Sequence, residues 1–341
     1  MATNAGRVTI VDVARAAGTS VSSASVALRG EPGVSAATRR RIMQTADRLG
    51  YRPDQRARTL RQQNSRLLGV TFAITQAFHA AVVEHLYQAV ADSEYDLVLS
   101  TTTEVRDGLR AAESLLADRC AALILVSPEI GNHDLAALSR RAPAVTVGSE
   151  LHAESVDSVH ADDRLGVAMA IEHLVALGHR DIHYIDGGRA VLGHTRREGY
   201  LEAMAAHGLR GRARILHGQA DEESGARAAA ELLAGSSLPT AVLAFNDRTA
   251  FGLVISLRLG GVDVPGQVSV VGYDDTRLAS LRNVELTTVS QDPAVLAATA
   301  VQRAIARAEG ETARAEEFVT PPRLVIRSTS AQPGGGRSAA H

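Results

Sequence analysis

Two patterns of apolar residues divide the chain. Between Thr9 and Gly50, apolar side chains recur every three or four positions in short runs, as they do in amphipathic helices. From Leu67 onward, short apolar runs alternate with longer amphipathic stretches, which is the pattern of a parallel α/β sheet. The sequence therefore predicts a small all-α head followed by a larger α/β body.

The head predicts a helix, a tight turn and a second helix. The first helix begins near Thr9 and ends at Gly18, and Ser20 can cap a second helix that runs to about Arg29. The apolar faces of the two helices comprise Ile10, Val13, Ala14 and Ala17, and then Ala24, Ala27 and Leu28. The opposite face of the second helix carries Val21, Ser22, Ser25 and Val26. These small side chains would let the backbone lie close in a DNA major groove, although an ordinary helical hairpin has the same pattern.

A third helix and a polar linker complete the head. The third helix is predicted from a cap at Ser35 to a stop at Gly50, with three arginines in one turn at 39–41. The following segment, 54–65, has only Ala57 and Leu60 as apolar members, which are too few to fold alone. We expect a helix-turn-helix domain at 1–53, a hinge helix or linker at 54–65, a two-lobed domain at 66–330 and a disordered tail at 331–341.

Charge is distributed unevenly between head and body. The chain has a formal net charge of −2, but residues 1–65 hold eleven arginines against four acidic residues, which gives +7 and leaves −9 for the rest. Cations near phosphates gain free energy from counterion release. The basic head therefore predicts a polyanionic partner.

The motifs of the head resemble the lac-repressor (LacI/GalR) family. The family pattern T-I-x-D-V-A, A-G-x-S, L-x-G, V-S-x-x-T-R-x-R and L-G-Y-x-P is matched at 9–14, 17–20, 28–30, 34–41 and 49–53. The resemblance implies that the head reads double-stranded operator DNA through Thr9, Ser20, Val21, Ser22, Ser25, Val26 and Arg29. It also implies a hinge helix in the minor groove, where Leu60 acts as a wedge with Ala57 on the same face. Val26 stands where the family often has a base-reading arginine, and Arg29 where asparagine is usual, so the operator sequence stays open.

The body predicts two similar lobes that meet near Asp162. The expected strands are 67–73, 96–102, 121–127 and 144–148, then 181–186, 214–218, 240–245 and 268–274. Three helices are expected in the first lobe, near 80–91, 107–117 and 132–141. Four more are expected after Asp162: one that ends at Gly178, and others near 196–207, 222–233 and 246–259. Extended segments around Val159, near 289–292 and near Pro321 are expected to cross between the lobes.

The paired lobes resemble the periplasmic sugar-binding-protein fold and the effector domain of the same family. The pieces that carry this resemblance are 69–70, 172–180, Arg196 with 199–200, 244–247, 261–265 and 269–275. Ligands of open α/β sheets bind at strand ends facing the cleft. The resemblance implies that Arg196, Asn246 and Asp274 bind the effector, since a guanidinium, an amide and a carboxylate can hold vicinal hydroxyls or carboxylates. Asn246 and Asp247 could instead cap the helix that they precede.

Departures from the family pattern bear on the ligand. Ala220 and Pro293 stand where sugar-binding members often have a stacking aromatic, which leaves Phe78, in the loop after the first body strand, and Tyr273 as platforms. Glu150 is the candidate for an acidic residue that some members place after the fourth strand. The expected effector is a sugar or another small polar metabolite.

Other classes of function have weaker support in the sequence. No nucleophile elbow, phosphate-binding loop, dinucleotide fingerprint or clustered metal ligands occur, so we expect no catalytic residue, cofactor or metal. No apolar run is long enough for a membrane span, and we expect a cytoplasmic, nucleoid-associated protein with a buried Cys120. A transporter's solute-binding protein would share the body without using residues 1–65, and an enzyme with a Ser/His/Asp site in the cleft stays open. We expect a homodimer on a pseudo-palindromic site, with a tetramer, the effector's identity and the direction of its effect left open.

Overall fold

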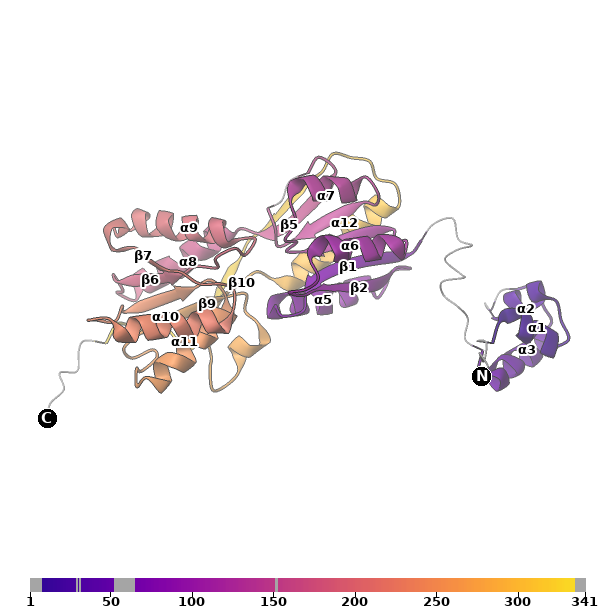
Figure 1. Cartoon of the computed structure of the whole chain (residues 1–341), viewed down its shortest axis with the longest axis horizontal. Coiled ribbons are helices and arrows are strands. Elements are labelled where there is room, and N and C mark those ends of the chain that lie inside the picture. Colours follow the sequence, from indigo (N-terminus) through magenta and orange to yellow (C-terminus); the bar gives the residue numbers. More distant parts are fainter. Residues whose placement is uncertain (1–7, 29, 31, 52–64, 151–152, 335–341) are drawn as a thin grey trace. The chain divides into compact units, whose positions relative to one another are not determined.

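The computed structural model describes residues 8–28, 30, 32–51, 65–150 and 153–334. The chain forms two compact units, Met1–Ser65 and Arg66–His341 (Figure 1). Each is described by itself.

The first unit is a three-helix domain, as predicted. Its helices are α1 (Ile10–Ala16), α2 (Val21–Leu28) and α3 (Ala36–Leu49). The apolar faces meet in a small core of Val13, Ala14, Ala17, Ala24, Ala27, Ile42 and Ala46. On the opposite side of α2, Val21 and Ser22 are exposed, whereas Ser25 and Val26 are partly buried.

Capping interactions fix the ends of these helices. Thr9 and Asp12 form a capping box at the start of α1, and the Ser23 backbone N–H donates to Ser20 Oγ over 3.1 Å at the start of α2. Helix α3 ends at Gly50, whose φ of 64° lies in the left-handed region that glycine adopts without strain. The predicted caps Ser20 and Ser35 and the predicted stop at Gly50 are confirmed, whereas α1 ends at Ala16, just before the expected Gly18.

The first lobe of the second unit is a parallel sheet covered on both faces. The sheet order is β11-β5-β4-β3-β1-β2, from β1 (Leu67–Ala73), β2 (Asp96–Thr102), β3 (Ala122–Val126), β4 (Ala144–Val147), β5 (Val156–Ala161) and β11 (Glu317–Thr320). Helices α5 (Ala77–Val90) and α12 (Pro293–Ala308) pack on one face. Helices α6 (Gly108–Ala117) and α7 (Asn132–Ser139) pack on the other.

The second lobe repeats this arrangement. Its sheet order is β12-β10-β9-β8-β6-β7, from β6 (Ile182–Ile185), β7 (Arg214–Leu216), β8 (Ala241–Ala244), β9 (Ser269–Tyr273), β10 (Thr287–Ser290) and the antiparallel edge strand β12 (Arg323–Val325). Helices α8 (Asp163–Ala176) and α9 (Gly193–Ala206) cover one face. Helices α10 (Glu222–Ala234) and α11 (Asp247–Leu259) cover the other, and the short helices η1 (Arg210–Arg212) and η2 (Arg277–Ser280) lie in loops.

Three segments cross between the lobes at the predicted places. The chain passes from β5 to α8, returns from β10 to α12, and crosses a third time from β11 to β12 (Figure 1). Helix α12 therefore belongs to the first lobe although it follows a strand of the second. The sequence analysis did not predict α12, β11 or β12. The signal for α12 was present in Asp292-Pro293, a cap followed by a proline at the first helical position.

Two expectations about single residues have clear outcomes. Phe78 lies in the first turn of α5, which begins at Ala77, so its placement in a loop was wrong. Cys120 is buried as predicted, and burial raises the pKa of its thiol to about 12. Among the described residues, no helix is long and apolar enough to cross a bilayer.

Candidate functional site

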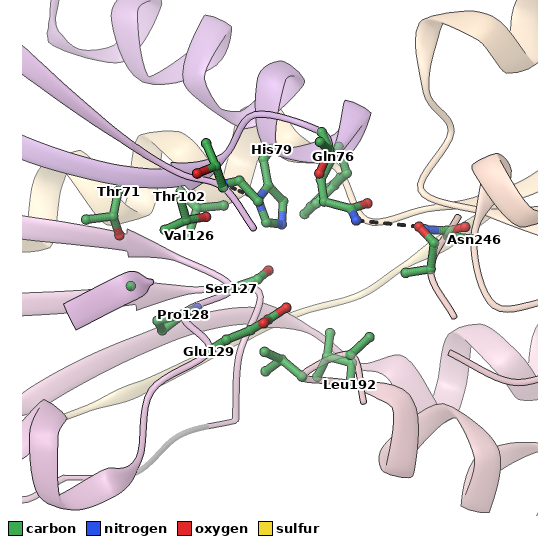
Figure 2. A pocket seen from close by; sticks show the side chains of 18 of the residues that line it. Thr71, Gln76, His79, Thr102, Val126, Ser127, Pro128, Glu129, Leu192 and Asn246 are labelled. Carbon is green, nitrogen blue, oxygen red and sulfur yellow. Dashed lines mark hydrogen bonds between the residues drawn. The ribbon is translucent and has the colours of Figure 1, made fainter. Parts of the chain in front are cut away.

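A cavity of about 650 Å³ lies where the carboxyl ends of strands from both lobes meet. The first lobe contributes residues at the ends of β1, β2 and β3 and the start of α5 (Figure 2). The second lobe contributes residues that follow β6, β7, β8, β9 and β10. The four residues predicted to bind an effector all line it. They are Phe78, Arg196, Asn246 and Asp274.

Arg196 is a buried, fixed cation and not a surface residue of its helix. Its side chain is 3% exposed, its Nε donates to Asp163 Oδ1 over 2.6 Å, and its Nη1 donates to the Phe245 carbonyl over 2.8 Å. The guanidinium carbon lies 3.6 Å from the centre of the Tyr273 ring. Tyr273 thus packs against Arg196 and does not line the cavity, so its prediction as a ligand platform was wrong.

Asn246 caps α11 and also lines the cavity. Its Oδ1 accepts hydrogen bonds from the Thr249 backbone N–H over 3.0 Å and from the Thr249 hydroxyl over 2.9 Å. Its amide nitrogen makes no hydrogen bond with any residue that the structure describes, which leaves a donor for a ligand. The two alternatives considered for Asn246, a cap and a cavity residue, therefore hold together.

Asp247 has a different task from its neighbour. Its carboxylate accepts hydrogen bonds from the Thr276 backbone and hydroxyl over 2.7 and 2.8 Å and from the Thr288 hydroxyl over 2.6 Å. These bonds hold the turn after β9, where Asp274 and Asp275 have positive φ values of 107° and 52°. Asp247 thus positions the turn that carries Asp274, and it does not cap α11.

Asp274 lies in a buried polar cluster at the second-lobe wall. Its Oδ1 accepts a hydrogen bond from Gln291 Nε2 over 2.7 Å and lies 3.7 Å from Arg196 Nη1. Burial raises the pKa of Asp274 to about 8, against the opposing effect of Arg196. At neutral pH the carboxyl can therefore donate as well as accept a hydrogen bond.

Cavity residues of the first lobe include several that the sequence analysis missed. His79 lines the cavity, and its Nδ1 accepts a hydrogen bond from the Ala73 backbone N–H over 3.0 Å. Gln76 also lines it and donates from Nε2 to the Ala220 carbonyl of the second lobe over 3.4 Å. Gln76 and His79 follow the end of a predicted strand by three and six residues, and this position was the available signal.

Glu150 contacts the second lobe outside the cavity lining. Its Oε2 accepts a hydrogen bond from the Thr195 hydroxyl over 2.8 Å, so it joins the lobes next to Arg196. Of the two residues that replace the expected aromatics, Ala220 lines the cavity and Pro293 does not. Phe78 is thus the predicted platform that remains.

The predicted DNA-contacting residues are described only in part. Thr9 and Ser20 are exposed and cap α1 and α2, and Val21 and Ser22 are exposed in the first turn of α2. Ser25 and Val26 lie one turn further along α2. Arg29, Ala57 and Leu60 lie outside the described residues.

Comparison with known proteins gives the same division of the chain. A family model described as bacterial regulatory proteins, lacI family, matches residues 9–54, and one described as a periplasmic binding protein-like domain matches 171–330. The chain is 32% identical over 330 residues to the HTH-type transcriptional regulator GalR of Escherichia coli K12, across 95% of this chain and 96% of that protein.

Solved structures agree with the sequence matches. A LacI transcriptional regulator from a Rhodococcus species is 42% identical, with a TM-score of 0.76 over 78% of this chain and 99% of that chain. The lac repressor dimer bound to operator and the anti-inducer ONPF is 28% identical, with a TM-score of 0.81 over 96% of this chain and all of that chain. The helix-turn-helix unit, the two-lobed unit and these matches together place the chain in the lacI family of bacterial DNA-binding transcriptional regulators.

Proposed function

We propose that the protein is a repressor that binds a pseudo-palindromic operator as a homodimer and whose DNA affinity is set by a small polar effector. The observation that carries this proposal is the cavity between the lobes, with Arg196, Asn246 and Asp274 at one wall and Phe78 at the other. A transport protein for the same ligand would need the cavity but not the helix-turn-helix unit. The presence of both in one chain favours ligand-controlled DNA binding.

The effector would be held mainly by three side chains of the second lobe. Arg196 is fixed by Asp163 and Phe245, so it can meet a ligand oxygen without first being ordered. The free amide of Asn246 supplies a second donor, and Asp274 can exchange a hydrogen bond with a ligand hydroxyl. Phe78 offers an apolar surface to the carbon skeleton of the ligand.

DNA would be read by the exposed start of α2. Small side chains at Val21, Ser22, Ser25 and Val26 let the helix lie close to base edges, and the caps Thr9 and Ser20 stand at helix ends that suit phosphate contacts. Arg29 would extend this surface, and Leu60 with Ala57 would wedge the minor groove. Replacing Leu60 by Ala should then weaken specific binding while non-specific binding, which depends on charge, stays nearly unchanged.

A dimer is expected because one short reading helix cannot specify a genomic site alone. The first lobe is expected to carry most of the contact. Large apolar side chains are exposed on it at Ile74, Tyr87, Leu99 and Val105, and on the second lobe at Ile255, Leu259, Leu278 and Leu281. Sedimentation of the protein alone and with operator DNA tests this; a monomer in both conditions would contradict it.

DNA binding at two salt concentrations tests the function as a whole. The protein should bind fragments from upstream of its own gene region more tightly than random DNA, and both affinities should fall as salt rises. Ligands that stabilise the protein in a thermal screen should then change operator affinity and leave random-DNA affinity nearly constant. A protein with no DNA affinity at low salt would refute the proposal.

A further inference from the structure

The first-lobe wall of the cavity holds a histidine with a fixed hydrogen-bonding role. His79 lies near the start of α5, is 8% exposed, and reaches the cavity between Thr71, Gln76 and Ser127 (Figure 2). The three side chains of the second lobe discussed above lie on the opposite wall. The chemistry of the ligand end that meets the first lobe therefore depends on His79 and its neighbours.

The hydrogen bond from Ala73 determines the tautomer of His79. A backbone N–H can only donate, so His79 Nδ1, at 3.0 Å from the Ala73 nitrogen, must carry a lone pair and no proton. Burial lowers the pKa of His79 to about 4, so the ring is neutral at physiological pH. The single ring proton is therefore on Nε2, which has no acceptor among the residues that the structure describes.

Two hydroxyl groups on the same wall have the opposite role. The Thr102 hydroxyl donates to the Phe72 carbonyl over 3.4 Å, and the Ser127 hydroxyl donates to the Gly148 carbonyl over 3.1 Å. Each hydroxyl has one proton, so both oxygens face a ligand only as acceptors. Together, His79, Thr102 and Ser127 thus offer one donor and two acceptors, which matches groups that both donate and accept, namely hydroxyls.

The charges on this wall disfavour an anionic ligand end. Glu104, Asp107 and Glu129 line the first-lobe side of the cavity. Arg106 also lines it, but its guanidinium is engaged elsewhere: Nη2 donates to Ser114 Oγ over 2.8 Å and Nη1 to the Thr101 carbonyl over 3.4 Å. These hydrogen bonds to neutral oxygens leave the Arg106 charge in place, but among the described residues the first-lobe lining carries three carboxylates against this one cation. A carboxylate or phosphate at this wall would therefore meet a net negative charge.

We propose that the effector presents an uncharged, hydroxyl-bearing end to the first lobe, and that His79 selects this end by donating a hydrogen bond from Nε2 to a hydroxyl oxygen. The proposal rests on the proposed function, because it assumes that the cavity is the effector site. It adds the ligand class, a neutral polyhydroxy compound, and a specificity-determining residue.

A ligand screen tests the ligand class. The full-length protein would be screened by thermal shift against neutral pentoses, hexoses, disaccharides and polyols, each beside its uronic acid or phosphate where one exists. At least one neutral compound should stabilise the protein, with its anionic counterpart binding at least about tenfold more weakly. Stabilisation by anionic compounds only, or by none, would overturn the ligand class. If operator binding is then normal, the proposed DNA-binding function stands while this inference fails.

Two substitutions separate the two hydrogen bonds of His79. His79→Asn keeps an acceptor for the Ala73 N–H but loses the donor at the Nε2 position, whereas His79→Gln keeps a donor near that position. With the neutral compound found in the screen, calorimetry should show a loss of about tenfold for His79→Asn and a much smaller loss for His79→Gln. Operator affinity without ligand should be unchanged in both. Wild-type ligand affinity in His79→Asn would overturn the role of His79.

The tautomer can be measured in the wild-type protein, with a His79 variant needed only to assign the ring. In ¹⁵N-histidine-labelled protein, long-range ¹H–¹⁵N spectra should show one ring, absent from the His79→Gln spectrum, with an unprotonated Nδ1 and a protonated Nε2. Adding the neutral compound should shift that Nε2 resonance. A protonated Nδ1, or an Nε2 that does not respond to the bound compound, would overturn the proposal; His79→Asn serves for the assignment if His79→Gln fails to fold.

Discussion

The two atoms of the Asn246 side-chain amide have different roles, one in capping a helix and one in the cavity. Its oxygen caps α11, while its nitrogen is free of hydrogen bonds to the described residues. The position before a helix therefore predicted the cap, and the position after a strand predicted the cavity residue. A substitution that keeps the oxygen and removes the nitrogen can separate these tasks.

Asn246→Ser is the corresponding variant. Serine is a good capping residue, so the melting temperature should change little. The lost donor should weaken binding of a stabilising ligand by about 1–1.5 kcal/mol, which calorimetry measures directly. Asn246→Ala is the control, because it should lose both ligand affinity and stability. An Asn246→Ser protein with wild-type ligand affinity would remove this residue from the site.

Asp274 gives the stability of the two-lobed unit a dependence on pH. Its pKa is raised by burial to about 8, above its ordinary value near 3.8, so the folded state binds more protons than the unfolded state between these values. The contribution of Asp274 to the free energy of unfolding should therefore be greatest at low pH and fall as pH rises toward about 8.

The Asp274→Asn variant isolates this effect, since the amide resembles the neutral carboxyl. Denaturant unfolding at pH 6 and pH 8 should show a smaller decrease in the variant than in the wild-type protein. An equal decrease in both would show that Asp274 does not titrate in this range in the folded protein.

For single residues, the sequence predicted which side chains line the cavity better than it predicted what those side chains contact. Arg196, Asn246 and Asp274 were identified by resemblance, and their common cavity followed from strand order. The burial of Tyr273 beneath Arg196 depends on a contact between elements distant in sequence, which no local pattern encodes. The tautomer of His79 depends on a hydrogen bond from Ala73, only six residues away, but its geometry is set by how the chain turns from β1 into α5. The same holds for Phe78, where the start of α5 at Ala77 lacks a side-chain cap that could have marked it.

Helix α12 is attached to the first-lobe sheet by a buried ion cluster. Asp157 of β5 is fully buried and accepts hydrogen bonds over 3.0 Å from both Arg303 Nε and Arg307 Nε of α12. It also accepts one from the Glu316 backbone N–H over 2.9 Å, next to β11. One carboxylate thus joins β5 to α12 and to the start of β11, two of the three elements that were not predicted from the sequence.

Removing Asp157 should be costly because it leaves the largely buried Arg307 without its carboxylate partner and leaves Arg303 paired with Glu311 alone. Asp157→Ala should lower the free energy of unfolding by roughly 3–5 kcal/mol. The exposed Arg164–Glu202 pair is the matched control, and Glu202→Gln should cost less than about 1 kcal/mol. Equal costs in the two variants, measured by denaturant unfolding, would contradict this account of α12.

The difference between predicted and missed elements has a physical reason. Strands β1 and β3 are continuous apolar runs because parallel strands are buried on both faces. Strands β11 and β12 are short edge strands with exposed positions, so they carry little apolar signal. Helix α12 has a regular apolar face, but it begins at Pro293, directly after the crossing segment expected near 289–292, and no helix was predicted there.

The whole second unit depends on contacts that span its lobes. The Thr195–Glu150 and Gln76–Ala220 hydrogen bonds join the lobes at two places near the cavity, and three covalent crossings limit how the lobes can move. The resemblance predicted the two lobes and the crossings. These two hydrogen bonds depend on the packed arrangement and could be found only in the structure.

Helix α12 also connects the cavity to the start of the second unit. Its first cap, Asp292, follows the cavity residue Gln291, and its last cap, Glu309, forms an ion pair with Arg66 over 3.2 Å. Arg66 is the residue at which the chain enters the two-lobed unit from the linker. The helix has 16 residues and therefore bridges about 24 Å.

Because α12 joins the cavity to Arg66, a change at its far end should alter how strongly a ligand changes operator affinity. The affinities for ligand alone and for operator alone should not change. Glu309→Gln should reduce the change in operator affinity that a ligand produces, while ligand affinity in the absence of DNA and operator affinity in the absence of ligand stay close to wild type. Glu94→Gln removes the other ion-pair partner of Arg66 without touching α12 and should leave the response intact. If a ligand changes operator affinity equally in the two variants, α12 has no special role in the response. If the responses differ, the strength of regulation can be adjusted at an exposed ion pair that belongs neither to the cavity lining nor to the helix-turn-helix unit, without altering the recognition of ligand or DNA.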